Sequence, residues 1–91
     1  MKGVYAVIEY DRYAVGRVVR RFRKERGLSQ EVFSGLCGLA RSHLAMIECG
    51  TKQANFETLW KIANACGVLP SQLVEQIEQE LRKPEASEKL P

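Results

Sequence analysis

The chain has 91 residues, of which 45% are hydrophobic and 27% charged, a length and composition that fit one ordinary globular domain. Its longest uninterrupted apolar run, Val4 to Ile8, is far shorter than the about 20 residues of a membrane-spanning helix, and no signal-peptide pattern precedes it. The three cysteines include no CxxC pair, which argues against a disulfide framework and against a zinc site built with His43. We therefore expect a cytoplasmic protein that does not enter a membrane and needs neither metal nor cofactor.

Positive charge is concentrated in one part of the chain, although the formal net charge is only +3. Residues 17 to 26 are rich in arginine, whereas acidic side chains outnumber basic ones after Leu69. A basic front and an acidic back are typical of a protein that approaches a polyanion from one side.

The first 13 residues carry β-branched and aromatic side chains between Val4 and Tyr10, a composition that predicts a short strand. The rest of the chain contains no second strand candidate, so the backbone groups of this strand would pair with a second copy of the chain or else be left to solvent. We therefore expect residues 1–13 to form an arm that contributes Val4, Val7 and Ile8 to a dimer contact.

The first helix is predicted from Ala14 to Arg26, followed by Gly27 as its stop. Its apolar stripe consists of Val15, Val18, Val19 and Phe22. The opposite side is rich in arginine, which favours contact with solvent or with a polyanion.

Residues Leu28 to Gly50 contain two short helix patterns separated by a break that leaves room only for a tight turn. Ser29 is an N-cap candidate for a helix that starts at Gln30, and Gly38 can adopt the left-handed conformation that ends it. A second helix follows from Ala40 to Gly50. The expected buried residues of the pair are Phe33, Ser34, Cys37, Leu44, Ile47 and Glu48. This layout is that of a helix-turn-helix unit, whose second helix can enter a DNA major groove.

A fourth helix is predicted to begin after Asn55, whose side chain can cap the free amides of a first turn, and to end at Gly67. The apolar positions that recur at helical spacing, and are therefore expected in the core, are Phe56, Leu59, Ile62, Ala63 and Cys66. Trp60 falls outside this stripe, which predicts partial exposure or a subunit contact.

A fifth helix is predicted to start at Pro70 and to turn Leu73 toward the core. Val74, Ile77 and Leu81 form a further stripe that a four-helix core would not need, so we expect either an extra packing layer or a symmetric dimer contact. Beyond it the chain is charged and flanked by prolines, which predicts a flexible tail over residues 83–91.

The run from Val15 to Leu73 resembles the Cro/repressor type of helix-turn-helix domain, often called the XRE family. The resemblance rests on the joint spacing of Gly16, Arg23, Gly27 to Glu31, Gly38, Arg41, Ser42, Ile47, Glu48, Gly50, Glu57 to Leu59, Lys61 to Ala63, Gly67, Val68 and Leu73. It implies an all-α fold, a compact five-helix lambda-repressor-like domain over residues 14–82, to which the residues before it add the short β-strand arm.

The function implied by the resemblance is that of a DNA-binding transcriptional regulator, in the simplest case a repressor. It would bind double-stranded DNA as a homodimer on a two-fold operator, with equivalent helices in major grooves about 34 Å apart. An enzyme is not expected, because the single histidine, His43, has no serine, cysteine or carboxylate placed to form a relay with it.

Base contacts are expected from the outer face of the second helix of the unit, which carries Arg41, Ser42, Ala45 and Met46. Arg41 is the strongest candidate, because a guanidinium can bond in a bidentate manner to O6 and N7 of guanine. Met46 and Cys49 stand where arginine, glutamine or asparagine is more usual in the family. We therefore expect either weak specificity or a contribution from DNA shape.

Phosphate contacts are expected from Gln30, which combines an amide side chain with a free backbone N–H at a positive helix end. The resemblance implies the same role for Gln30, and it places Lys52 in a loop that often reaches phosphate. His43 and Arg17 are further candidates. The resemblance also implies a structural ion pair between Arg23 and Glu48.

An alternative function is a protein-interaction module on the same fold, such as an antitoxin that also binds its own promoter. Val32 and Leu36 lie on the outer side of their helix, where the family more often has charged residues. Exposed apolar side chains at these positions would mark the binding site of a partner protein.

Overall fold

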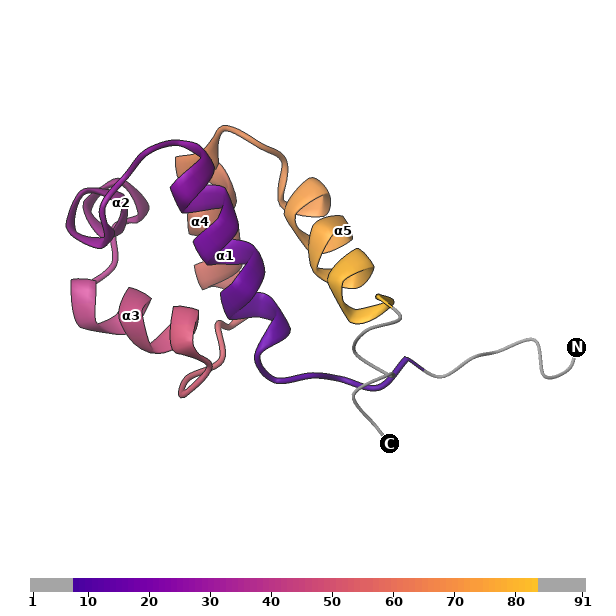
Figure 1. Cartoon of the computed structure of the whole chain (residues 1–91). Helices are drawn as coiled ribbons and strands as arrows, with labels where there is room; N and C mark the ends of the chain where they lie inside the picture. Colours follow the sequence, from indigo (N-terminus) through magenta and orange to yellow (C-terminus); the bar gives the residue numbers. More distant parts are fainter. Residues whose placement is uncertain (1–7, 84–91) are drawn as a thin grey trace, which may run out of the picture.

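Five helices follow one another in the computed structural model, which describes residues 8–83 (Figure 1). They are α1 (Ala14–Glu25), α2 (Gln30–Cys37), α3 (Arg41–Cys49), α4 (Phe56–Cys66) and α5 (Pro70–Leu81). The all-α prediction is thus confirmed, and the helix bounds agree with the expected ones to within a residue. In the part of the chain described, no helix is long and apolar enough to cross a membrane.

Helices α2 and α4 begin where a side chain satisfies a free amide of the first turn. Ser29 Oγ accepts a hydrogen bond from the amide of Val32 at 3.1 Å, and Asn55 Oδ1 accepts one from the amide of Thr58 at 2.8 Å. At the start of α5 the bond runs the other way, because the amide of Leu69 donates to Gln72 Oε1 at 2.8 Å. The N-caps predicted at Ser29 and Asn55 are confirmed.

The core lies between α1 and the helices around it. Helix α1 packs against α3 on one side and against α5 on another (Figure 1). Its fully buried large side chains are Val18, Val19, Phe33, Leu44, Ile47, Ile62 and Leu73. These residues come from all five helices, so the burial of apolar surface holds the whole domain together rather than any single pair of helices.

Phe56 corrects the prediction for α4, because this side chain is 63% exposed rather than buried. It occupies the first position of α4, where the helix has only begun to enter the core, and its ring makes an edge contact with Trp60 at 5.8 Å between centroids. Leu59, one turn further on, packs against the core. The partial exposure predicted for Trp60 is confirmed.

Ile77 corrects the prediction for α5. This side chain is only 6% exposed and belongs to the core of the same protomer, so it offers no surface to a second copy. Leu73 is buried as expected, Val74 is exposed, and Leu81 packs partly against the core. The extra packing layer, one of the two alternatives expected for this stripe, is therefore present at Ile77 and Leu81.

The N-terminal strand is the least supported expectation. Residues 8 to 10 are exposed and have no regular secondary structure, and the Tyr10 hydroxyl bonds to Gln53 in the α3–α4 loop. Val4 and Val7 lie outside the described residues, as does most of the predicted tail, residues 84–91.

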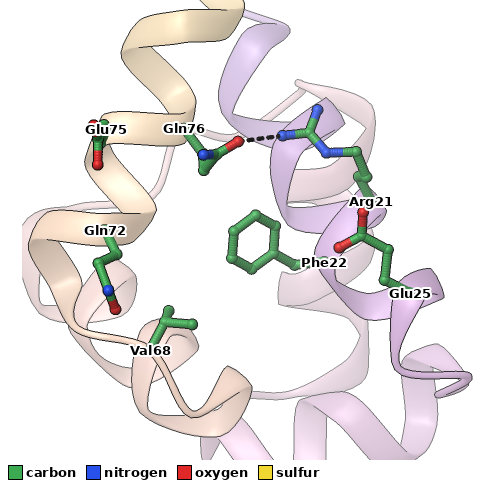
Figure 2. Close-up of a pocket in the computed structure, with 7 residues that line it drawn as sticks. All are labelled: Arg21, Phe22, Glu25, Val68, Gln72, Glu75 and Gln76. Atoms are coloured by element: carbon green, nitrogen blue, oxygen red, sulfur yellow. Dashed lines mark hydrogen bonds between the residues drawn. The ribbon is translucent and has the colours of Figure 1, made fainter.

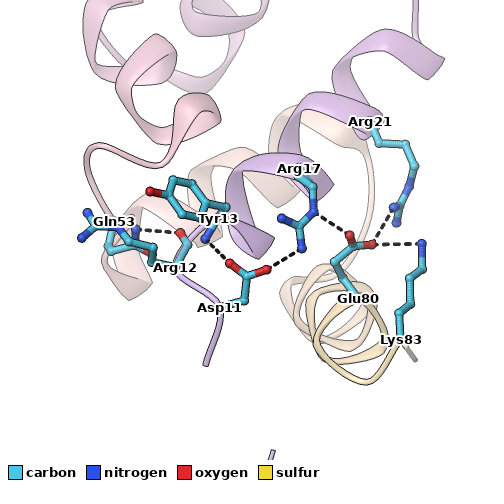
Figure 3. A network of polar contacts seen from close by, with 8 residues as sticks. All are labelled: Asp11, Arg12, Tyr13, Arg17, Arg21, Gln53, Glu80 and Lys83. Atoms are coloured by element: carbon cyan, nitrogen blue, oxygen red, sulfur yellow. Dashed lines mark hydrogen bonds and ion pairs between the residues drawn. The ribbon is translucent and has the colours of Figure 1, made fainter. Parts of the chain in front are cut away.

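Two arginines of the basic side of α1, Arg17 and Arg21, face α5 rather than a free surface, whereas Arg20 and Lys24 are exposed; the basic front and the acidic back are therefore partly in contact. Glu80 of α5 is buried and accepts from Arg17 Nε at 2.7 Å and from Arg21 Nη1 at 3.4 Å (Figure 3). Lys83 Nζ adds a third contact at 3.2 Å. Glu80 of α5 therefore compensates part of the positive charge of α1 within the protomer.

A hollow of about 410 Å³ remains between α1 and α5 (Figure 2). Its lining residues are Arg21, Phe22, Glu25, Val68, Gln72, Glu75 and Gln76. Arg21 Nη2 donates to Gln76 Oε1 across it at 3.1 Å. The two helices are thus joined by polar bonds where their apolar side chains do not fill the space.

Candidate nucleic-acid interface

A short connection joins α2 to α3, and one side of α3 faces solvent. Gly38 ends α2 in the left-handed conformation, with φ of +73°, and α3 begins three residues later at Arg41. Phe33 of α2 and Leu44 of α3 are fully buried, so the apolar sides of the two short helices meet in the core. The remaining side of α3 is left free to meet a partner.

The end of α3 lies directly against α1 at Gly16. A methyl group added to Gly16 would overlap the backbone carbonyl groups of Ile47 and Glu48. Glycine is therefore required here for close approach of the two helices. This contact fixes the position of the C-terminal half of α3 relative to the rest of the domain.

A buried polar cluster joins α1, α2 and α3. Arg23 forms a bidentate pair with Glu48, with 2.7 Å from Nε to Oε2 and 2.9 Å from Nη2 to Oε1. Arg23 Nη1 also donates to the carbonyl oxygen of Leu28 at 2.8 Å, and Gln30 Nε2 donates to Glu48 Oε1 at 3.0 Å. The hydrogen bonds to Glu48 raise the pKa of Arg23, although burial acts against this shift. The expected ion pair is present, and it extends to Gln30.

The outer face of α3 carries side chains that leave the core. Arg41, Ser42, Met46 and Cys49 are exposed, and Ala45 is half-buried between them. These positions follow one another at helical spacing along one side. The four side chains assigned to base contacts are therefore brought together on a single surface.

The C-terminal end of this face contains a thiol. Cys49 Sγ lies 3.4 Å from Thr51 Oγ1, and both groups are within hydrogen-bond distance of the Met46 carbonyl oxygen. The hydrogen bonds with Thr51 lower the pKa of the Cys49 thiol. The other two cysteines are buried free thiols, and burial raises the pKa of Cys37 to about 12.

The residues predicted to contact phosphate differ in their exposure and in the hydrogen bonds they already make. Lys52 is exposed in the loop after α3, and His43 is half-buried on α3. The side-chain amide of Gln30 uses one N–H for Glu48, which orients the group and leaves its second N–H available. These three residues lie on α2, α3 and the following loop, around the exposed face of α3.

Arg17 differs from these three residues. Its guanidinium is bound to Glu80 at 2.7 Å and to Asp11 at 2.8 Å. The bond to Glu80 is the main reason for the raised pKa of Arg17. Two carboxylates already compensate the charge of this group, so Arg17 is a weaker phosphate candidate than Gln30, His43 and Lys52.

Sequence reasoning missed the residues that precede α1. Arg12 Nε and Nη2 donate to the carbonyl oxygen of Gly50 at 3.1 and 2.9 Å. Figure 3 shows a second bond, from Gln53 Nε2 to the carbonyl oxygen of Arg12 at 2.9 Å. Tyr10 donates its hydroxyl to Gln53 Oε1 at 2.7 Å. These bonds join positions about 40 residues apart, so no local pattern in the sequence indicates them.

Comparison with known proteins agrees with this geometry. A family model described as helix-turn-helix matches residues 19–73. The uncharacterized HTH-type transcriptional regulator y4dJ of Sinorhizobium fredii is 35% identical over 63 residues, which are 69% of this chain and 82% of y4dJ. Control protein C.BamHI of Bacillus amyloliquefaciens is 34% identical over 65 residues, which are 70% of this chain and 80% of C.BamHI.

A solved structure gives the same result. The restriction-modification controller protein C.AhdI from Aeromonas hydrophila has a TM-score of 0.66 and 33% sequence identity, and the match covers 69% of this chain and 96% of C.AhdI. Fold and site together define a helix-turn-helix protein. The chain belongs to the helix-turn-helix family of the Cro/repressor, or XRE, type, which confirms the resemblance found in the sequence.

Proposed function

We propose that this protein is a DNA-binding transcriptional regulator that occupies a two-fold operator as a dimer, with α3 of each subunit in a major groove. One observation carries the proposal. The inner side of α3 is fixed by Gly16 and by the Arg23–Glu48 pair, whereas its outer side carries exposed side chains at helical spacing, Arg41 and Ser42 among them. Membership of the helix-turn-helix family and similarity to proteins named as a regulator and as control proteins support this reading.

Arg41 is the main base-reading residue in this proposal. It stands at the first position of α3, and the first turn of a recognition helix is the part that reaches base edges most readily. Ser42 can donate or accept a hydrogen bond, while Ala45 and Met46 can contact a thymine methyl group. Sequence preference then depends on few hydrogen bonds, and DNA shape supplies the rest.

Gln30, His43 and Lys52 would position the protein on the backbone. They flank the exposed side of α3, and each can donate a hydrogen bond to a phosphate oxygen. Because Gln30 also bonds to Glu48 at 3.0 Å, the buried cluster would hold its amide in place before DNA binds. Phosphate docking would therefore cost little side-chain ordering.

The dimer contact is proposed on the N-terminal arm or on α5. Ile8 of the arm and Val74 of α5 are exposed apolar side chains, and Leu81 is half-buried. Deletion of residues 1–9, with sedimentation as the readout, tests whether the arm contributes; an unchanged dimer mass assigns the contact to α5. In this role the protein acts in the cytoplasm and performs no catalytic step.

The decisive experiment uses the DNA upstream of the gene, searched for an inverted repeat and tested in a gel shift. The expected result is a discrete complex with this DNA that survives a large excess of random duplex. Equal displacement by random DNA would contradict sequence-specific regulation. A salt titration adds a second measurement, because several phosphate contacts produce a steep fall of affinity with salt.

A second function, protein interaction alongside DNA binding, is favoured by one observation on α2. Val32 and Leu36 are 52% and 59% exposed and stand one turn apart. An apolar pair of this kind fits a partner protein such as the toxin that an antitoxin neutralises. Co-purification with the product of a neighbouring gene, abolished by Leu36→Asp while DNA binding persists, would establish this function.

A further inference from the structure

Residues 10–13, here called the N-terminal strap, bind the end of α3 before the chain enters α1. Gly50 is at the centre of the contact. Its carbonyl oxygen accepts both bonds from Arg12, and the ring of Tyr13 fills the space that a side chain at Gly50 would occupy. Tyr10 and Arg12 both bond to Gln53. The strap therefore lies beside the end of α3 and the α3–α4 loop and forms one surface with them.

The guanidinium of Arg12 is held in place by only some of its N–H groups. Its two bonds to Gly50 leave further N–H groups without a role in that contact, and the group also lies 5.9 Å from the centroid of the Tyr13 ring. The side chain is exposed, and within residues 8–83 it takes part in no ion pair. Arg12 is thus a fixed, uncompensated positive charge.

Two charged residues, Asp11 and Lys52, lie near Arg12 in the chain or in the loop that the strap contacts. Asp11, the acidic residue next to Arg12, is bound to Arg17 at 2.8 Å and accepts a hydrogen bond from the amide of Tyr13 at 2.9 Å (Figure 3). Its carboxylate is therefore directed toward Arg17 at the start of α1 (Figure 3). Lys52, exposed in the loop that the strap contacts, adds a second positive charge. Two cations at the end of a recognition helix form a site for a polyanion.

We propose that Arg12 and Lys52 together bind a backbone phosphate of DNA at the C-terminal end of α3, with Arg12 held in its binding position by Gly50 and Tyr13. This inference rests on the proposed function. A guanidinium with one edge on a carbonyl oxygen and the other edge in solvent can donate to a phosphate oxygen without leaving its first partner. The N-terminal strap is then part of the DNA-binding surface.

The test is a salt titration of DNA binding by the full-length protein, followed by fluorescence anisotropy. Arg12→Gln keeps a hydrogen-bond donor for Gly50 but removes the charge. It should weaken binding about tenfold, the effect of one charge-assisted hydrogen bond, and lower the slope of log K against log salt by about one. Arg12→Lys should retain the slope. Lys24→Gln, which removes an exposed positive charge at the far end of α1, is the matched control and should change neither quantity.

Three outcomes would overturn the proposal. The first is a wild-type slope and affinity for Arg12→Gln, and the second is an equal loss for Lys24→Gln. The third is an equal loss of slope for Arg12→Lys, which would assign Arg12 a purely structural role at Gly50. If the wild-type protein itself shows no salt-dependent binding to any duplex, the proposed function fails, and not this site alone.

A measurement on the wild-type protein avoids any effect of a substitution on folding. Modification by an arginine-specific dicarbonyl reagent is followed by mass spectrometry with and without duplex DNA. DNA should protect Arg12 from modification. Arg82, an exposed residue directly after the end of α5, should react equally with and without DNA. Equal modification of Arg12 in both samples would refute the phosphate contact, as would protection that appears on dimerisation in the absence of DNA.

Discussion

Arg23 and Glu48 stand 25 residues apart in the sequence and are joined by two hydrogen bonds of 2.7 and 2.9 Å. Their side chains are only 10% and 4% exposed. The pair connects α1 to the inner side of α3, the helix whose outer side is proposed to read DNA. A charged pair in this position stabilises the fold and also sets the orientation of the reading helix, because both partners are satisfied only in one arrangement.

Glu48→Ala should lower the free energy of unfolding by about 3 kcal/mol or more, because it leaves the buried guanidinium of Arg23 without its partner. Urea unfolding followed by circular dichroism measures the change. Glu78→Ala is the matched control, since Glu78 pairs with Arg82 in a largely exposed bond that contributes less than about 1 kcal/mol. Equal effects of the two substitutions would show that burial does not strengthen the dependence on Glu48.

Glu80 predicts a dependence of stability on pH. Burial raises the pKa of this carboxyl group, but its bonds with Arg17 and Lys83 outweigh burial and lower the pKa below the ordinary value of 4.5. A lowered pKa in the folded state means that the stabilisation is complete above pH 4.5 and is lost as the pH falls through the folded-state pKa.

We therefore expect Glu80→Gln to be less stable than the wild type by about 2 kcal/mol at pH 7, with the difference shrinking as the pH is lowered below 4.5. Urea unfolding at a series of pH values measures it. A difference that stays constant down to pH 3 would contradict the assignment, because it would not depend on ionisation of Glu80.

Gly16 and Gly35 form a natural pair for testing the contact between α1 and α3. Gly16→Ala places a methyl group against the backbone of Ile47 and Glu48, and it should destabilise the protein by about 1–3 kcal/mol, the usual effect of overpacking. Gly35 lies within α2, with no neighbour within 4 Å of an added Cβ, so Gly35→Ala should stabilise it by up to about 1 kcal/mol through helix propensity. The same sign for both would reject the close approach at Gly16.

Thiol reactivity tests the position of Cys49. The thiol is exposed and has a lowered pKa, whereas burial raises the pKa of Cys37 and of Cys66. Iodoacetamide at pH 8 should therefore modify Cys49 first in the native protein, and all three cysteines only in denaturant. Operator DNA should slow the modification of Cys49, because this residue lies on the outer face of α3. Unchanged labelling in the presence of bound DNA would place the interface elsewhere.

Substitutions at Arg41 and Gln30 separate base reading from phosphate docking. Arg41→Ala should reduce specific binding by about 1–3 kcal/mol and relax the preference at one base position, while binding to random duplex changes much less. Gln30→Ala should weaken binding to both DNAs in equal measure. Gel shifts with an operator and a scrambled duplex give both quantities. An equal loss on both DNAs for Arg41→Ala would exclude its proposed role.

Local rules were sufficient to predict the five helices and most of the core. Ser29 and Asn55 have the side chains that cap a helix, and Gly38 has the freedom to end one, so these boundaries depend on residues close to each other in sequence. The contact between Arg23 and Glu48 is long-range, and it was expected only because the chain resembles a family that contains it. No periodicity in the sequence places these two side chains together.

The failures have a common physical origin. Helical spacing shows which side of a helix is apolar, but it does not show where the neighbouring helices end, so Phe56 was expected inside and is exposed. Charge along the chain does not show which charges meet, so Arg17 was assigned to phosphate although Glu80, 63 residues away, binds it. The bonds from Arg12 to Gly50 belong to the same class.

The separation of the two sides of α3 also affects how the protein can change over evolutionary time. Arg41, Ser42 and Met46 bring their side chains to solvent, and the bonds that Met46 makes to Thr51 and Lys52 use only its backbone carbonyl oxygen. Replacing these side chains would remove no buried polar contact, and only Met46, which is 40% exposed, contributes partly buried apolar surface. A library randomised at these three positions should therefore yield mostly folded proteins with altered operator preference, so new target sites are accessible to this scaffold without a loss of stability.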